Sequence, residues 1–170
     1  MDVPASYWIE KFRLIPHVEG GAYKEVYRSP MVLASDCLSP NFSGERHICT
    51  SIYFLLQKGE FSAFHRIHSD ETWHFYFGDA LMIYEIELSG NLIEHRLGNN
   101  PDEGEDFQCT IKAGNWFGAR VIAMGNYSLV GCTMSPGFDF NEFELGRREK
   151  LINQYPRYKE LISSMTRLTG

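Results

Sequence analysis

Two side chains that could carry out acid–base or metal chemistry, His65 and Glu71, lie six positions apart between Gly59 and Gly78. Imidazole and carboxyl groups move protons near neutral pH, and both also bind divalent metals. A turn at Ser69-Asp70 would place the pair on two adjacent strands of one β-hairpin. The spacing therefore predicts a polar site inside a β-structure.

The alternation of side chains along strands predicts which neighbours share this site. On the first strand, Phe61, Ala63 and Ile67 have the same parity as His65, whereas Arg66 and His68 have the opposite parity. On the second strand, the parity of Glu71 is shared by three aromatic residues, Trp73, Phe75 and Phe77. His74 and Tyr76 are expected on the outer face of the sheet.

His65 and Glu71 can each be interpreted as a functional residue or as a structural one. His65 is either a metal ligand or general base, or a buried histidine that bonds a neighbour. An inward Glu71 requires a cation, an arginine partner or a raised pKa, because burial disfavours a free carboxylate. The two residues are predicted to form a pair in which the carboxylate orients the imidazole and makes it a better proton acceptor.

Further candidate residues lie on or beside the predicted strands. Tyr53 could act as an acid near a sugar ring, or be a core residue. Arg28 and Arg46 could bind a carboxylate or phosphate at the mouth of a pocket, or form surface ion pairs. The aromatic residues that could stack on a ligand, or pack in the core instead, are Trp73, Trp116 and Phe117.

The pattern of short strands and turns predicts a β-sandwich or barrel with helical ends. A first helix is expected over residues 5–12 and a helical segment over residues 147–168, broken at Pro156. The segment 35–45 is rich in Ser, Asn, Pro, Asp and Gly and is expected to be a loop, able to act as a lid. The strands are expected at residues 22–27, 48–56, 61–67, 71–77, 81–88, 92–97, 107–111, 115–123 and 127–134.

Length, charge and cysteine spacing limit the classes of protein to which this chain can belong. The chain has 170 residues, which suits one domain over residues 1–170 with a barrel core at about 20–145. It carries 16 Lys plus Arg against 22 Asp plus Glu, without a basic face that would bind nucleic acid. No apolar run approaches the length of a membrane span, and no signal peptide is apparent. The four dispersed cysteines form no Cys-x2-Cys pair, so we expect reduced thiols and a cytoplasmic location.

The segment 59–78 resembles the first motif of the cupin superfamily, Gly-x5-His-x-His-x3/4-Glu-x6-Gly, whose histidines and glutamate usually hold a divalent metal. Here His65 and Glu71 match, but Ile67 replaces the second histidine. In the region of the second motif, Gly114 keeps the turn and Phe117 occupies the histidine position. Only two of the four metal ligands remain, so we expect no cofactor; a metal, if bound, would use His65 and Glu71.

Longer phrases resemble one subfamily, the uncharacterised cupin-5 proteins. They lie at Leu14 to Ser29, Thr50 to Leu81, Ala113 to Val121 and Leu129 to Leu145. The resemblance implies a mainly β fold, the cupin double-stranded β-helix or jelly-roll barrel, and structural kinship with deoxysugar-nucleotide epimerases. It also implies a homodimer paired sheet to sheet, which agrees with His74 and Tyr76 at outward positions.

Three hypotheses for function follow. The first is a metal-independent epimerase or isomerase that removes a proton from a sugar or sugar-nucleotide-like substrate, with His65 as base and a tyrosine as acid. The second is a non-catalytic module that binds a carbohydrate-like or nucleotide-like ligand. The third is a degenerate divalent-metal cupin enzyme in which His68, His74 or water completes the metal shell.

Overall fold

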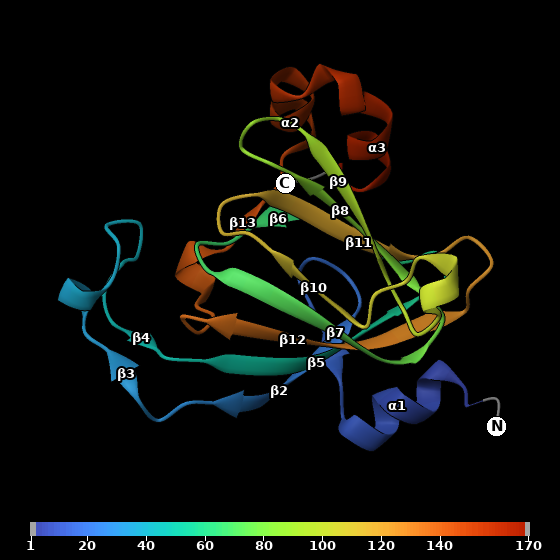
Figure 1. Ribbon diagram of the computed structural model, residues 1–170, viewed down its shortest axis with the longest axis horizontal. Helices are drawn as coiled ribbons and strands as arrows, with labels where there is room; N and C mark the ends of the chain where they lie inside the picture. Colours follow the sequence, from blue (N-terminus) through green and yellow to red (C-terminus); the bar gives the residue numbers. More distant parts are fainter. Residues whose placement is uncertain (1–2, 169–170) are drawn as a thin grey trace.

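The computed structural model describes residues 3–168 and consists of two packed antiparallel β-sheets with short helices on their outer faces (Figure 1). One sheet has six strands in the order β1-β2-β5-β12-β7-β10, and the other has five in the order β13-β6-β11-β8-β9. This architecture confirms the predicted mainly β barrel with helices at both ends. Among the described residues, no helix has the length and hydropathy needed to cross a membrane.

The bounds of the strands agree closely with the predicted pattern. The six-stranded sheet contains β1 (Ile15–Pro16), β2 (Ala22–Arg28), β5 (Thr50–Gln57), β7 (Asp70–Gly78), β10 (Gln108–Ile111) and β12 (Tyr127–Ser135). The five-stranded sheet contains β6 (Phe61–Arg66), β8 (Leu81–Ile86), β9 (Leu92–Leu97), β11 (Trp116–Val121) and β13 (Glu144–Leu145). A separate pair, β3 (Val32–Leu33) and β4 (Arg46–His47), extends from one end of the barrel (Figure 1).

The helices cover the outer faces of the sheets. Helix α1 (Ala5–Phe12) lies against the six-stranded sheet, where Phe12 stacks on Tyr53 with a ring-centroid distance of 4.5 Å. Helices α2 (Arg148–Gln154) and α3 (Lys159–Ser164) lie on the five-stranded sheet, with a 3-10 turn, η4 (Pro156–Tyr158), between them. This break confirms the effect expected of Pro156. Three further 3-10 turns are η1 (Ser35–Cys37), η2 (Pro101–Glu103) and η3 (Phe140–Glu142).

The hairpin predicted to carry His65 and Glu71 is not formed. Strand β6 pairs with β11 and β13, whereas β7 pairs with β12 and β10, so the chain crosses between the sheets at residues 67–69. Local alternation predicts both strands correctly but does not specify the strands with which they pair. His65 and Glu71 therefore project from facing sheets rather than from one hairpin.

Two irregularities also reverse predicted side-chain directions. Phe117 pairs with His65 and Ala119 pairs with Ser62, so β6 advances three residues where β11 advances two. Strand β6 therefore contains one extra residue, a β-bulge. This extra residue turns Phe61 to the outer face, where it packs beneath the C-terminal helices, while Ile67 stays inside as predicted. A similar shift in β7 turns Phe77 outward, so that its ring lies 5.3 Å from the ring of Trp8.

Candidate active site

A cavity of about 630 Å³ lies between the two sheets, within the usual size range of small-molecule sites. Its walls combine aromatic rings with a few charged groups. The lining residues that carry the chemistry are His17, Glu19, His65 and Glu71, and the aromatic walls are Tyr23, Phe54, Trp73, Phe138, Phe140 and Phe143. The predicted polar site thus exists, but two of these four chemical groups, His17 and Glu19, were not among the candidates.

Glu19 is held between two histidines at the inner end of this cavity. Its Oε2 atom lies 3.3 Å from Nε2 of His65 and 3.3 Å from Nδ1 of His17, and Ser62 Oγ donates to its Oε1 at 2.8 Å. Burial alone would raise the pKa of Glu19. The charge of His65 and the hydrogen bonds from His17 and Ser62 outweigh burial and hold this pKa below its usual value. Glu19 is therefore a carboxylate at neutral pH.

Both ring nitrogens of His65 have protein partners. Its Nδ1 lies 2.8 Å from the carbonyl oxygen of Ala63, which can only accept, so Nδ1 carries a proton. Its Nε2 lies 3.3 Å from the Glu19 carboxylate. Phe117 and Phe143 contact the ring at centroid distances of 4.1 and 5.2 Å and fix its orientation.

His17 differs from His65 because one of its nitrogens is free. The backbone N–H of Glu19 lies 3.4 Å from Nδ1 of His17, and the Glu19 carboxylate lies 3.3 Å from the same nitrogen. Nδ1 accepts from the N–H when it carries no proton and donates to the carboxylate when it carries one. Within residues 3–168, Nε2 of His17 has no protein hydrogen-bond partner. The side chain is only 8% exposed, lines the cavity and packs edge-on against Tyr23 at a centroid distance of 4.6 Å.

Glu71 has the opposite electrostatic environment to Glu19. Burial first, and then the negative charge of Glu19, raise the pKa of Glu71 to about 8, although hydrogen bonds from Trp73 and Cys132 act against this shift. Trp73 Nε1 donates to Glu71 Oε2 at 3.1 Å. Glu71 is therefore a neutral carboxylic acid at pH 7. The predicted pairing of His65 with Glu71 is wrong, since Glu19 is the carboxylate that meets His65.

The backbone of Gly20 explains how Glu19 reaches β6. Gly20 has φ +121°, and a Cβ atom there would lie 2.1 Å from the carbonyl oxygen of Phe61. Only glycine permits this approach, which also lets Ala63 N–H donate to the Glu19 carbonyl at 2.8 Å. The sequence signal that could have pointed to these residues is His17-x-Glu19 directly before Gly20-Gly21.

The other candidates are distributed over three environments. Trp73 lines the cavity, and Phe117 lies behind His65 as a support for its ring. Tyr53 lies on the outer face of β5 beneath α1, so the phenol in the cavity is that of Tyr23. Trp116 lies on the outer face of β11, with the Arg66 guanidinium 4.7 Å from its ring centroid.

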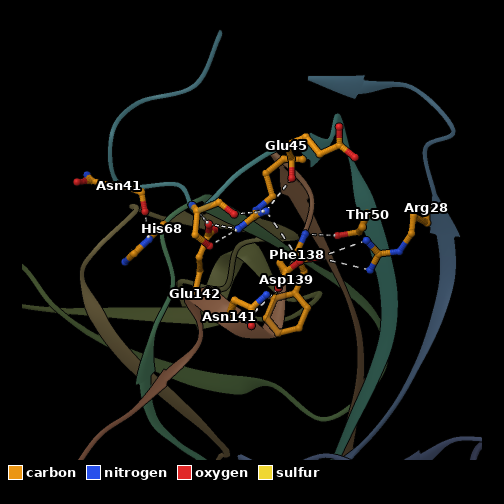
Figure 2. A network of polar contacts seen from close by, with 11 residues as sticks. Arg28, Asn41, Glu45, Thr50, His68, Phe138, Asp139, Asn141 and Glu142 are labelled. Carbon is orange, nitrogen blue, oxygen red and sulfur yellow. Dashed lines mark hydrogen bonds and ion pairs between the residues drawn. The ribbon is translucent and has the colours of Figure 1, made fainter. Parts of the chain in front are cut away.

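The two candidate arginines differ in their relation to the cavity. Arg28 lines the cavity, donates twice to Glu25 at 2.9 and 2.6 Å, and contacts the carbonyl of Phe138 (Figure 2). Arg46 does not line this cavity. It is 5% exposed and forms a buried ion pair with Glu142, and its Nε has no partner within residues 3–168.

The residues present do not fit a cupin metal centre. The two missing histidine positions are filled by hydrocarbon side chains, Ile67 and Phe117, which are 4% and 0% exposed. His68 bonds the carbonyl of Asn41 at the rim, and His74 contacts Thr133 on the outer face, so neither approaches Glu71 as a ligand. Across residues 3–168, no three His, Cys, Asp or Glu side chains are grouped to hold a metal ion.

Two sheets that enclose one cavity, with strands from both contributing polar side chains, define a cupin-type barrel. A family model described as "Cupin superfamily (DUF985)" matches residues 6–146. The chain therefore belongs to this family. No curated protein matches the sequence.

Solved structures support the same relationship. A protein from Shewanella oneidensis is 39% identical, with a TM-score of 0.86 over 97% of this chain and 98% of that chain. A hypothetical protein from Leishmania major is 33% identical, with a TM-score of 0.87 over 96% and 99% of the two chains. Oxalate decarboxylase from Bacillus subtilis is 13% identical, with a TM-score of 0.53 over 88% of this chain and 36% of that chain, a likeness of fold alone.

Proposed function

We propose that the protein is a metal-independent epimerase or isomerase that moves a proton on a small sugar-like substrate. One observation supports this proposal: a single cavity holds a carboxylate between two imidazoles, one of which has a free nitrogen, together with a separate carboxylic acid, Glu71, on β7. Titratable groups whose environments push their pKa values apart are suited to act as base and acid.

His17 takes the role of base in place of His65. In the tautomer with its proton on Nδ1, His17 donates to the Glu19 carboxylate instead of accepting from the Glu19 N–H, and its Nε2 keeps a lone pair. His65 acts on Glu19 instead, because both its nitrogens are occupied and its charge keeps Glu19 ionised. His65 is thus a positioning residue, and His17 and Glu19 form the base-and-orienter pair.

Glu71 is the proposed acid. His17 Nε2 takes the proton from a carbon beside a carbonyl, and the electron pair of that C–H bond moves into an enolate. Glu71 then donates its proton to the opposite face of the same carbon, which inverts the configuration there. The raised pKa of Glu71 keeps this proton available at neutral pH, and exchange with water restores both groups.

The cavity walls support a compact substrate with an apolar face. Trp73 and Phe54 meet edge to face at a centroid distance of 5.7 Å and present rings to the interior, as expected of a site that stacks a sugar. The Arg28 guanidinium is already bonded to Glu25, so this pair offers both donors and acceptors to hydroxyl groups at the mouth.

The test is hydrogen exchange into candidate substrates. The protein is incubated in D2O with a panel of keto sugars, aldoses and nucleotide-linked keto sugars, and incorporation of one deuterium is followed by mass spectrometry. We expect His17→Gln and Glu71→Gln to lose exchange by at least about 100-fold, the usual contribution of a positioned acid or base. His95→Gln is the matched control, because His95 pairs with Glu85 at 2.7 Å outside the cavity.

The outcomes separate an enzyme from a binding module. Exchange that is lost in both cavity variants and kept in His95→Gln supports the proposal. If compounds raise the melting temperature of the wild type and show no exchange, the protein is a ligand-binding module instead. Exchange that persists in His17→Gln would move the role of base to another group.

A further inference from the structure

The residues 137–143, which we call the strap, connect β12 to β13 and include η3. Five of them, Phe138, Asp139, Phe140, Asn141 and Phe143, line the cavity. Phe140 stacks on His17 at a centroid distance of 6.0 Å, and Phe143 stacks on His65 at 5.2 Å. The strap therefore covers the two imidazoles that flank Glu19.

The strap is attached near its two ends, at one end to the barrel and at the other to Ser43 and Arg46 of the β3–β4 extension (Figure 2). At one end, Phe138 N–H donates to Thr50 Oγ1 at 2.9 Å, and the Phe138 carbonyl accepts from Arg28 at 3.3 Å. At the other end, the Glu142 carboxylate accepts from Ser43 N–H at 3.0 Å and pairs with Arg46.

The middle of the strap has few attachments to the barrel. The Asn141 N–H bonds the Asp139 side chain at 2.9 Å, and the Glu142 N–H bonds the Asp139 carbonyl at 3.1 Å, so these bonds stay within the strap. Asp139 lies 3.9 Å from Arg46, the outer limit of an ion pair, and Phe140 is 53% exposed. Segments with few external bonds and exposed side chains open at low free-energy cost.

The Arg46–Glu142 pair is unusual because it is buried yet incompletely bonded. Arg46 is 5% exposed and Glu142 is 8% exposed, and Arg46 Nε has no partner within residues 3–168. A buried donor without a partner costs free energy that hydration would recover. Movement of the strap away from Arg46 would admit water to this group, which lowers the cost of breaking the ion pair.

We propose that the strap is a lid over the cavity and that the buried Arg46–Glu142 ion pair is the latch that holds it closed. Opening separates Glu142 from Arg46 and lifts Phe140 and Phe143 from the two imidazoles. The lid controls access to the cavity whatever its ligand, so this inference does not depend on the reaction proposed above.

Cys132 supplies a reporter of opening that needs no ligand. Its thiol lines the cavity, is 3% exposed and is free. Its rate of alkylation by iodoacetamide, followed by mass spectrometry of its peptide, measures the fraction of time for which the lid is open. Burial raises the pKa of the Cys132 thiol and raises that of Cys109 to about 12, so both thiols react slowly. Cys109 does not line the cavity and is therefore an internal control.

The test compares Glu142→Gln with Glu144→Gln. The first replaces the charged latch by a neutral amide that can still accept from Ser43. The second removes a partly exposed partner of Arg66 only a short distance along the chain. In Glu142→Gln, loss of the charge-assisted bond is expected to raise the alkylation rate of Cys132 about tenfold, equivalent to about 1.4 kcal/mol in the free energy of lid opening. In Glu144→Gln the alkylation rate should not change.

Three results would contradict the proposal that the strap is a lid. One is an unchanged Cys132 rate in Glu142→Gln; another is a parallel rise at Cys109, which would mean general loosening of the fold. The third comes from the wild type alone: hydrogen exchange should be faster in residues 137–143 than in β12, and equal protection of both segments would show that the strap does not open.

Discussion

Replacing Glu71 with glutamine should make the protein progressively more stable than the wild type as pH rises from 5 to 8. The folded protein holds a proton on Glu71 up to about pH 8, whereas the unfolded chain releases it near the usual pKa of 4.5. Between these values the folded state binds more protons, so stability falls as pH rises. Glutamine resembles the protonated side chain and carries no such linkage.

The size of the effect follows from one proton. Stability changes by about 1.4 kcal/mol per pH unit for one proton of difference between the states. Glu71→Gln should therefore match the wild type near pH 4.5 and exceed it by about 3 kcal/mol at pH 7. Glu19 acts in the opposite sense, because its lowered pKa gives a contribution that is lost as pH falls below its usual value. The stability contribution of Glu19 therefore changes below pH 5 and stays constant between pH 5 and pH 8.

The assay is urea unfolding of both proteins at pH 5, 6, 7 and 8, with the difference in unfolding free energy plotted against pH. Taking the difference removes contributions that both proteins share. Glu87→Gln, on the exposed turn after β8, controls for the loss of a surface carboxylate. A difference that does not vary with pH would refute a protonated Glu71, and with it the proposed acid.

Further predictions concern the backbone, the metal and the outer core. Gly20→Ala should destabilise the fold by at least about 2 kcal/mol, because of its positive φ and the contact with β6, whereas Gly104→Ala, with open space around its Cβ position, should cost only about 1 kcal/mol. Urea unfolding tests both variants. Elemental mass spectrometry on protein without a histidine tag should find no stoichiometric first-row metal; near-stoichiometric metal that is lost in His65→Ala and Glu71→Ala would contradict this expectation. Trp116→Ala should lower stability by about 3–5 kcal/mol, yet leave the alkylation rate of Cys132 unchanged relative to Cys109, because Trp116 lies on the outer face of the barrel.

The limits of sequence reasoning are visible in the aromatic and basic candidates. Tyr53 and Trp116 have residue types that suit a sugar site, but both lie on outer sheet faces beneath helices. Residue type alone does not give the direction of a side chain, and parity must be anchored to a known inward residue. Arg46 is a different case, since its role depends on Glu142, a residue 96 positions away.

The sequence by itself determined the local elements and the family. Alternating apolar residues specified the strands, Pro156 specified the break between α2 and α3, and the spacing of His65, Glu71 and the glycines identified a cupin barrel. Each of these features depends on neighbours within a few residues. Local patterns are readable because side-chain direction repeats with the geometry of the strand or helix.

Only the tertiary structure decided the composition of the site. The chain crosses between sheets after β6, so His65 and Glu71 face each other across a cavity instead of pairing. Gly20 brings Glu19 to His65 over 46 positions of sequence, and the same loop supplies His17. Strand partners, bulges and close backbone approaches arise from long-range packing, which a single sequence does not encode in its spacing.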